Sequence, residues 1–454
     1  MNSIFFLRNF KESCHIKNIG ELQLKFIQAR ELLLFENSVA MAAKVIHEFI
    51  FAVTLIALLV DLCWATQRIS DKSSAKLLDV MAYGAVGDGS TDDSPAFMRA
   101  WEAACKSSSN GKMVVTSGMK FLLNPTTFSG PCNSPVQVHI RGVIIAPQQS
   151  AWKNGDTSKW LEFSGITGLR IGGGGIINGQ GHLWWEKSCK VNKKNPCRKA
   201  PTAMYIHSCK DVVVKNLQFV NSQQMHLAIF YSSGIHVSAL TIRAPKESPN
   251  TDGIHLQGVT DANVYNCDIA TGDDCVSITS GMSRTYNVLI QSIKCGPGHG
   301  ISIGSLGKGG EKASVEKIRV RDVVFDGSDN GARIKTWQGG SGYARKIVFS
   351  NITVKNVGYP IIIDQNYCDS SKPCKINQKS AVQIEYVTFE NIRGTSTQEQ
   401  AVKFLCSQSV PCKDIIVRNV DIKSVVSSST ISVCLNSYGS AFGHVNPLSC
   451  LQRL

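Results

Sequence analysis

The feature that most constrains the fold of this chain is a unit that returns every 23 to 35 residues. Each copy has a short run of β-branched residues, then Asn or another small polar residue, then an alternating apolar pair. One supersecondary unit per step, with loops of variable length, is typical of a solenoid. The residues taken as equivalent, which follow one another in steps of 23, 27, 26, 30, 29, 35 and 33, are Asn216, Ala239, Asn266, Ser292, Asp322, Asn351, Tyr386 and Asn419.

The short strands favour stacked coils over other all-β or α/β folds. No helical pattern of ten or more residues separates the strands, which argues against alternating strands and helices. A β-sandwich would show hairpin turns at short, regular spacing, and these connections are too long and too uneven. One coil cannot bury its apolar face alone, so neighbouring coils must supply the core. The sequence therefore predicts a single all-β domain, a right-handed parallel β-helix.

Residues 78–105 precede the repeats and have a different pattern. A short strand, a Gly-rich loop and then a helix explain this segment. Thr91, Asp92 and Asp93, followed by Pro95, are typical of a helix start. We expect this helix to cover the N-terminal end of the solenoid as a short cap.

The first 66 residues divide into two parts. From Met41 the chain has a Lys and then an apolar run from Phe49 to Val60, followed by a small residue, Ala65, at a plausible cleavage point. That run is too short to span a bilayer comfortably and suits the core of a signal peptide. We therefore predict a signal peptide at 41–66, an extension of doubtful status at 1–40, and the β-helix domain at 67–454. The Asn351 sequon also points weakly to the secretory route and is a candidate glycosylation site.

Charge and cysteine usage narrow the partner. The chain has 48 Lys and Arg against 34 Asp and Glu, a formal net charge of +14. A basic surface suits nucleic acid, an anionic membrane or an acidic polysaccharide, or is merely soluble. Cysteines in close pairs without zinc-site spacing indicate disulfides in an oxidising compartment, which makes nucleic acid the weakest partner. These pairs are Cys189 with Cys197, Cys368 with Cys374, Cys406 with Cys412, and Cys434 with Cys450.

Four polar clusters interrupt consecutive repeats. Each follows an equivalent strand, so stacking would bring all four to one side of the solenoid. Three carboxylates, an imidazole and two cations in one patch suit glycoside hydrolysis, in which one carboxylic acid protonates the leaving oxygen and another carboxylate activates water or attacks the sugar. Crowding of like charges would raise the pKa of at least one carboxyl. The clusters are Asn250-Thr251-Asp252, Asp273-Asp274, Gly298-His299-Gly300 and Arg333-Ile334-Lys335.

Each cluster also has a plainer interpretation. An Asp pair often caps a helix, an Asn-Thr-Asp-Gly run often forms a turn, and His299 between glycines would ordinarily be a turn residue. Arg333 and Lys335 are more often a solvated strand edge, although their spacing on a strand points both to one face, where they could receive the carboxylate of an acidic sugar. Their joint occurrence on successive repeats is what favours a catalytic site.

The four clusters, in this order and on this repeat, resemble the signature motifs of the polygalacturonases, glycoside hydrolase family 28. The resemblance extends from about Leu78 to Leu451 and includes the segment 363–368, which contains Tyr367. It implies an inverting hydrolysis that needs no metal or other cofactor. Asp273 would be the general acid, Asp252 and Asp274 would hold and deprotonate water, and His299 would tune the acid.

The same resemblance assigns the remaining site residues. Arg333 and Lys335 would bind the substrate carboxylate, Tyr367 would contact a sugar ring, and Asn250 belongs to the same substrate-binding motif. It also suggests a disulfide between Cys275 and Cys295. The sequence around Arg333 looks most like that of the plant enzymes thought to cut internally.

These implications predict a secreted, monomeric enzyme of the cell wall. Its substrate would be homogalacturonan, with no nucleic acid and no stable membrane association. Three alternatives stay open at this point: a relative acting on rhamnogalacturonan or a substituted galacturonan, a calcium-dependent pectate lyase on the same fold, and a catalytically silent wall-binding protein. End-cutting instead of internal cutting is a further alternative.

Overall fold

The computed structural model describes residues 77–152, 158–369 and 378–453, together with Ile50 and Thr54. The chain divides into two compact units, Met1–Ala75 and Lys76–Leu454. The predictions made for 1–40 and 41–66 therefore fall almost wholly outside the described residues. Within the part that the structure describes, no helix is both long and apolar enough to cross a membrane.

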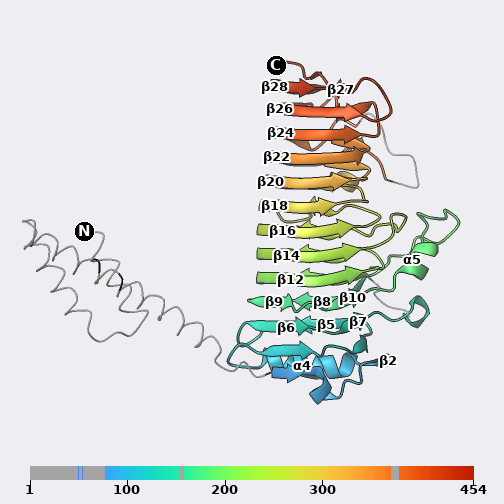
Figure 1. Ribbon diagram of the computed structural model, residues 1–454, viewed down its shortest axis with the longest axis vertical. Helices are drawn as coiled ribbons and strands as arrows, with labels where there is room; N and C mark the ends of the chain where they lie inside the picture. Colours follow the sequence, from blue (N-terminus) through green and yellow to red (C-terminus); the bar gives the residue numbers. More distant parts are fainter. Residues whose placement is uncertain (1–49, 51–53, 55–76, 153–157, 370–377, 454) are drawn as a thin grey trace, which may run out of the picture. The chain divides into compact units, whose positions relative to one another are not determined.

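The unit Lys76–Leu454 is a right-handed parallel β-helix, as the sequence predicted (Figure 1). The described strands form two sheets, of 17 and 11 strands, called sheet A and sheet B here, and neighbouring strands within each sheet run parallel. In the repeated region, successive odd-numbered strands of sheet B alternate along the chain with even-numbered strands of sheet A. Each coil of this region thus contributes one strand to each sheet, which places equivalent residues of successive coils one above another.

The strand bounds are as follows. Sheet A contains β1 Leu77–Asp79, β2 Asp88–Asp92, β3 Lys112–Val115, β4 Lys120–Leu122, β6 Val136–Ile140, β7 Val143–Ile145, β9 Leu169–Gly172, β10 Ile176–Asn178, β12 Lys210–Val220, β14 Ser233–Arg243, β16 Thr260–Ala270, β18 Thr285–Cys295, β20 Lys312–Asp326, β22 Ser341–Val357, β24 Gln383–Ser396, β26 Cys412–Ser424 and β28 Ser437–Asn446. Sheet B contains β5 Thr126–Ser129, β8 Lys159–Ser164, β11 Thr202–His207, β13 Leu227–Phe230, β15 Ile254–Gln257, β17 Val276–Thr279, β19 Ile301–Leu306, β21 Asn330–Trp337, β23 Tyr359–Tyr367, β25 Gln400–Leu405 and β27 Ile431–Leu435.

The core consists of columns of apolar side chains that run along the stack. One column in sheet A pairs residue with residue from coil to coil, and each member is at most 2% exposed. Each such side chain stabilises the fold by about 1.5–3 kcal/mol relative to an exposed position, and Phe349 and Phe389 also stack with ring centroids 5.4 Å apart. The column is Val214, Val237, Val264, Ile290, Val320, Phe349, Phe389 and Val417.

The repeat position found in the sequence is a bend in the strands of sheet A. Its residues have φ between 50° and 56°, in the left-handed region that Asn and Asp tolerate better than most residues. Together they form a column that we call the bend column. It consists of Asn216, Ala239, Asn266, Ser292, Asp322, Asn351, Asn391 and Asn419.

One of the eight predicted equivalences was wrong. Tyr386 is not in the bend column, because the register of β22 with β24 places Asn391 beside Asn351. Tyr386 instead lies opposite Lys346, in a second column of left-handed residues. Both positions share the same backbone conformation and lie five residues apart, so counting steps along a chain with loops of variable length could not separate them.

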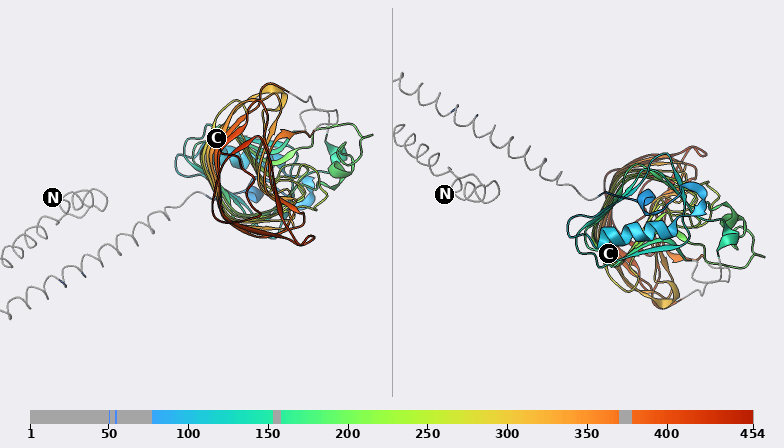
Figure 2. Two further views of the ribbon diagram at one scale, coloured as in Figure 1. Left: turned by 90° about the horizontal axis from the view of Figure 1, so that it is seen from above. Right: turned by 90° about the horizontal axis from the view of Figure 1, so that it is seen from below.

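The predicted N-terminal helix is α4, Ser94–Cys105, with Pro95 in its first turn. It buries Phe97 and Trp101, and the Trp101 ring packs edge-on against Phe128 of β5 at 5.3 Å. Seen from below, α4 lies across the end of the coil stack (Figure 2). Asp93 precedes the helix, but its carboxylate accepts hydrogen bonds from the Val86 and Gly87 amides of the preceding loop, so its side chain does not cap the helix.

The other helices among residues 77–152, 158–369 and 378–453 are short: η1 Val80–Tyr83, η2 Gln149–Ala151, α5 His182–Glu186 and η3 Lys308–Gly310. Helix α5 and the loop after it stand out from one side of the stack, as both end-on views show (Figure 2). This projection lies before β11, in the coils that lead to the polar clusters.

Candidate active site

Three of the predicted catalytic residues occupy the same place in three consecutive coils. Asp252, Asp274 and His299 each lie two residues before a strand of sheet B, namely β15, β17 and β19. Backbone hydrogen bonds connect these segments, from the Gly253 amide to the Asp274 carbonyl and from the Cys275 amide to the Gly300 carbonyl. Stacking therefore brings together residues that lie 47 positions apart in the sequence.

Asp252 is 7% exposed and has a polar neighbour from the next coil. The Ser277 hydroxyl donates to its Oδ2 at 2.6 Å, and Nδ1 of His255 lies 2.7 Å from the same hydroxyl oxygen. Burial is the main reason that the pKa of Asp252 is raised well above its usual range, and the nearby charges of Asp273 and Asp274 raise it further. Asp252 is thus the carboxyl in this cluster that most favours keeping a proton.

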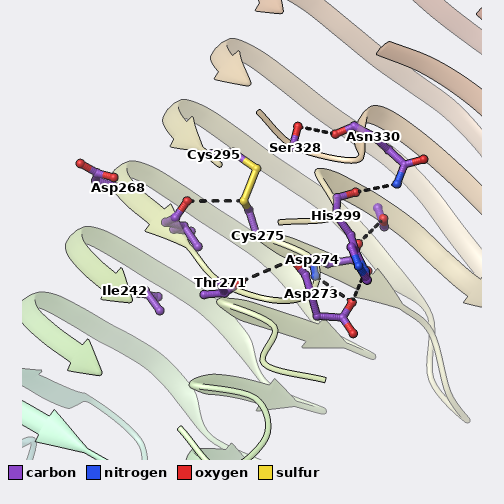
Figure 3. The surroundings of a disulfide bond; sticks show 12 residues. Ile242, Asp268, Thr271, Asp273, Asp274, Cys275, Cys295, His299, Ser328 and Asn330 are labelled. Atoms are coloured by element: carbon purple, nitrogen blue, oxygen red, sulfur yellow. Dashed lines mark hydrogen bonds and ion pairs between the residues drawn. A yellow bond between two sulfur atoms is a disulfide. The ribbon is translucent and has the colours of Figure 1, made fainter. Parts of the chain in front are cut away.

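Asp273 and His299 form a hydrogen-bonded pair. Nδ1 of His299 lies 3.0 Å from Oδ1 of Asp273, and that oxygen also accepts from the Asp274 amide at 2.8 Å (Figure 3). Burial opposes the charge of Asp273, but the bond and charge of His299 outweigh it and lower the carboxyl pKa. Burial likewise opposes a charged His299, yet Asp273 raises the imidazole pKa above its ordinary value. The pair therefore favours an ionised carboxylate beside an imidazolium.

Asp274 is the most enclosed of the three carboxylates, at 1% exposed. Its Oδ1 accepts from Arg333 Nη2 at 2.5 Å and from the Ser302 hydroxyl at 2.7 Å, while its Oδ2 accepts from Lys335 Nζ at 2.9 Å. Such charge-assisted hydrogen bonds offset the cost of burying a carboxylate. Arg333 and Lys335 do lie on one face of β21, as predicted, and in this structure that face contacts Asp274.

The sequence predicted a raised pKa for at least one carboxyl of the cluster, and burial together with crowding raises that of one of them. The raised pKa belongs to Asp252, whereas the resemblance made Asp273 the general acid. The proton nearest to Asp273 is carried by its partner, His299. An assignment of the acid must therefore include His299.

The cluster also has the composition of a cation site. One ligand atom each from Asp273, Asp274 and His299 lies within 4.8 Å of the others. The residues do not fit a metal ion well, because Asp274 already accepts hydrogen bonds from Arg333 and Lys335. The positive charges of these two side chains would repel the metal ion. The imidazole nitrogen facing Asp273 is also occupied by that carboxylate. The donor set is thus better suited to an acid–base cluster than to a metal.

Tyr367 and Asn250 lie around this cluster. Nζ of Lys335 is 5.2 Å from the centroid of the Tyr367 ring, which also packs edge-on against Trp337 at 6.0 Å. Asn250 has a left-handed φ of 56° and lines a groove beside the cluster. Among the described residues, neither Tyr367 nor Asn250 has a hydrogen bond to the carboxylates.

The disulfides agree in part with the predicted pairs. Cys275, which directly follows Asp274, forms a disulfide with Cys295 (Figure 3). This bond fixes the start of β17 to the end of β18. Cys189–Cys197, Cys406–Cys412 and Cys434–Cys450 are also bonded. Cys374 lies outside the described residues, so the Cys368–Cys374 prediction cannot be followed there. Sequence spacing missed the Cys105–Cys132 bond, whose partners are 27 residues apart.

Several residues of the cluster escaped the sequence interpretation. His255 and Ser277 are paired across β15 and β17, and Ser302 pairs with Arg333 across β19 and β21. Asp329 lies 3.6 Å from Nε2 of His299. His255 ends the Asn-Thr-Asp-Gly-Ile-His run and could have been found, whereas single serines carry no signal until the strand register is known. The remaining candidate, Asn351, is exposed on the bend column, as a glycosylation site requires.

Comparison with known proteins agrees with this geometry. The family model for the glycosyl hydrolases family 28 matches residues 105–443. A probable polygalacturonase of Arabidopsis thaliana is 46% identical over 386 residues, covering 85% of this chain and 86% of the relative. Polygalacturonase-2 of Solanum lycopersicum is 45% identical over 378 residues, covering 83% and 81%.

A solved structure shares the fold. The endo-xylogalacturonan hydrolase of Aspergillus tubingensis superposes with a TM-score of 0.67 at 21% identity, over 82% of this chain and 99% of its own. At that identity the likeness concerns the fold alone. The family model and the two plant relatives cover most of the chain, and the motifs come together in one cluster, so the chain belongs to family 28 of the glycosyl hydrolases and is of the plant polygalacturonase type.

Proposed function

We propose that this chain hydrolyses the α-1,4-D-galacturonosidic linkages of pectic polygalacturonate, mainly at internal positions. Membership of family 28 supports pectin degradation by glycoside hydrolysis. The observation that carries the proposal is the cluster of three carboxylates and an imidazole beside two cations, all from consecutive coils. Carboxyls in unlike environments supply the acid and the base that this reaction needs, and the cations suit an anionic sugar.

The Asp273–His299 pair is the proposed source of the proton for the glycosidic oxygen. Asp273 is the residue that contacts the leaving oxygen, by resemblance to the family. The raised pKa of His299 keeps a proton on the pair at mildly acidic pH, 3.0 Å from the carboxylate that would pass it on. His299 is then a positioning residue that reloads the acid between turnovers.

Asp252 and Asp274 are the proposed holders of the attacking water. The hydrogen bonds of Asp274 with Arg333, Lys335 and Ser302 stabilise its charged form. Asp252 has the raised pKa, so it must lose its proton before it can accept one from water. The rate should therefore increase as Asp252 ionises and fall as the Asp273–His299 pair loses its proton, which gives a bell-shaped dependence on pH.

The two cations are the proposed partners of the substrate carboxylate. Arg333 uses Nε for Ser302 and Nη2 for Asp274, and its Nη1 provides a third donor. Tyr367, in contact with Lys335, offers a ring to a sugar, and Asn250 extends the polar surface beside Asp252. Because both cations also neutralise Asp274, removing either one should affect turnover as well as binding.

Inversion is proposed from the family resemblance. Carboxyl groups of inverting enzymes are usually about 6.5–9.5 Å apart, whereas Asp273 and Asp274 have oxygens within 4.8 Å of each other. The carboxyl–carboxyl separation of this pair does not by itself support inversion. Proton NMR of the products formed in the first minutes decides the question: the β-anomer from the α-linkage means inversion, and the α-anomer means retention.

A time course of oligomer sizes from polygalacturonate tests both the hydrolysis itself and whether the bonds are cut internally or at the chain ends. We expect reducing ends to appear with a random mixture of fragments at early times, which is internal cutting. Monomer alone from the outset would mean end cutting. Unsaturated products that absorb in the ultraviolet would mean a lyase, and no reducing ends from polygalacturonate would remove the proposal.

The proposed setting is the cell wall, reached by secretion as a monomer. The five disulfides among the described cysteines are consistent with an oxidising compartment. Homogalacturonan is the proposed partner, without nucleic acid and without stable membrane association. The net charge of +14 favours such an acidic polysaccharide.

A further inference from the structure

The outer face of sheet A has a patch of cations that is separate from the catalytic cluster at sheet B. It spans the successive strands β3, β6, β9 and β12, of which β6, β9 and β12 are labelled in the stack of Figure 1. Neighbouring side chains of a strand point to opposite faces, and buried neighbours such as Val138, Ile171 and Val214 belong to the core. We call this surface the sheet A patch. Its members, all at least partly exposed, are Lys112, His139, Arg141, Arg170 and Lys215.

The strand register arranges most of the patch in two rows that run along the stack. In one row Lys112 lies beside Gln137, and Gln137 lies beside Arg170. In the other row a glycine of β9 separates His139 from Lys215. Strands β3 and β12 are three strand spacings apart, roughly 14 Å. The rows therefore form a cationic strip that can contact several units of a linear polymer.

The cations of the sheet A patch are unpaired. Among the described residues, none of its Lys and Arg side chains has a hydrogen bond or an ion pair. The two rows contain no Asp or Glu between β3 and β12. Asp79 of β1 ends the row of His139, but its carboxylate already accepts from the Thr116 hydroxyl and the Met81 amide. Asp211 lies at the start of β12, outside both rows. The described protein thus leaves this positive charge open to a partner.

Cations further along the same face are paired. In the row that contains Lys215, Nη2 of Arg321 donates to Oε1 of Gln291 on the neighbouring strand at 2.7 Å. In the same row, Nη1 of Arg418 lies 3.9 Å from Oε2 of Glu390, again on the neighbouring strand. The unpaired charge of this row therefore belongs to its first coils.

The imidazole of His139 lies in the positive field of the patch. Burial is the main reason that its pKa is lowered, and the charges of Lys112 and Arg141 lower it further. A surface with one sign of charge raises the local concentration of ligands with the opposite sign. A polyanion is therefore the kind of partner that this surface favours.

The chemistry of the patch suits an acidic polysaccharide. Lys and Arg donate charge-assisted hydrogen bonds to carboxylates. The Gln137 amide, which lies between Lys112 and Arg170, has a donor and an acceptor for hydroxyl groups. Polygalacturonate carries a carboxylate and hydroxyls on each internal unit, so one linear chain can use both kinds of side chain along the strip.

We propose that the sheet A patch binds de-esterified pectate and holds the protein on the polymer while another stretch of chain is cut at sheet B. The proposal rests on the proposed function, because its partner is the substrate polymer. It predicts retention on polygalacturonate that weakens as salt screens the charges and as methyl esters replace the carboxylates. Cleavage of short oligomers, which need only the catalytic cluster, should not depend on the patch.

Retention on immobilised polygalacturonate tests the proposal. The Asp273→Asn background prevents hydrolysis during the measurement. In that background we expect the triple variant Lys112→Gln, Arg170→Gln and Lys215→Gln to raise the Kd for the polymer tenfold or more at low salt, because two contacts on one polymer bed reinforce each other. With Asp273 intact, the same triple variant should keep kcat/KM for trigalacturonate within twofold of the parent.

A second triple variant, Lys355→Gln, Arg393→Gln and Lys423→Gln, is the matched control. These exposed cations lie on β22, β24 and β26 of the same sheet, so the change in net charge is equal. We expect the control to change the Kd less than twofold. Equal weakening by both triple variants would overturn the proposal, because the overall field alone would then hold the polymer. An unchanged Kd in the patch variant would also overturn it and would favour an acidic protein as the partner of this surface.

Failure of this proposal can be distinguished from failure of the proposed function. Retention is measured without turnover, whereas the proposed function is tested by the reducing ends that the parent releases from polygalacturonate. A parent that depends on the patch for retention but releases no reducing ends would contradict the proposed function alone. A parent that releases them, with equal retention of both triple variants and the parent, would contradict the role of the patch alone.

Discussion

Two columns of polar residues run along this molecule, and they differ in how their side chains find hydrogen-bond partners. In the bend column on sheet A, Asn351, Asn391 and Asn419 are exposed, and their amides donate to one another from coil to coil. In the column before sheet B, Asp252 and Asp274 are buried, and Asp274 requires two cations. The coil spacing is the same in both columns.

The comparison shows that stacking equivalent polar residues does not by itself shift a pKa or require charged partners. An amide carries a donor and an acceptor, so equal amides in successive coils satisfy one another. Ionised carboxylates only accept hydrogen bonds, so stacking them in a buried place raises a pKa or recruits cations and hydroxyls. Water at the bend column offers a further partner to its exposed side chains, whereas the buried Asp252 and Asp274 must find their partners within the protein.

The largest effect should come from removing the transferable proton. Asp273→Asn should lower kcat on polygalacturonate by about 10²- to 10⁴-fold, because an amide cannot act as the acid. Circular dichroism and the unfolding midpoint should stay near the parental values. Asp322→Asn, the same change in the exposed bend column, is the control and should leave kcat within twofold. Near-normal turnover of the Asp273 variant would end its assignment as the acid.

A change in pH dependence should follow from removing the partner of that acid. His299→Ala should move the descending limb of the kcat profile to lower pH. The imidazole pKa is raised, so the pair in the parent keeps its proton to higher pH than a carboxyl alone. The ascending limb, which we assign to Asp252, should stay in place. A descending limb at the parental pH would show that His299 does not hold the proton.

Stability should increase when the most crowded carboxyl loses its ability to ionise. The pKa of Asp252 is raised in the folded protein, so the protonated side chain stabilises the fold relative to the ionised one. This stabilisation is fully present below the unfolded pKa of about 3.9 and is lost as the pH rises through the folded pKa. Asp252→Asn removes that loss. We expect its midpoint in guanidinium to exceed the parental one at pH 7, with a smaller difference at pH 4, while activity falls. Equal differences at both values would contradict the raised pKa.

The smallest effect should come from the bend column. Asn391→Ala should reduce the free energy of unfolding by about 1–2 kcal/mol, because Ala is strained at a left-handed φ. The variant also loses the hydrogen bonds with Asn351 and Asn419. Asn391→Gly keeps the backbone relaxed and isolates the hydrogen-bond part. Both variants should retain parental kcat, and a loss of activity would mean that the two columns are coupled.

Much of the fold was predictable because the repeat is local in sequence. Asn or Asp stands at six of the eight positions of the bend column and marks those coils in the sequence, since few other residue types accept this backbone conformation. The error at Tyr386 arose where residues 352–390 separate two true equivalents, and only the register of β22 with β24 resolves it. The helix before the repeats was found from Pro95 and its neighbours, although Asp93 binds the loop instead of the helix.

The cysteines show the same limit. Pairs separated by a short loop, such as Cys406 and Cys412, can be proposed from spacing. Cys105 and Cys132 are brought together only by the packing of the first coils, and Cys209 and Cys267, free and buried, behave as apolar core residues.

The sequence by itself determined which chemical groups are present and that successive coils carry them on one side. The tertiary structure decided which carboxyl keeps the proton and that Arg333 and Lys335 contact Asp274. The physical reason is that charge and hydrogen-bond energies depend on distances of a few ångströms and on burial, and loops of unequal length fix neither until the coils are in register.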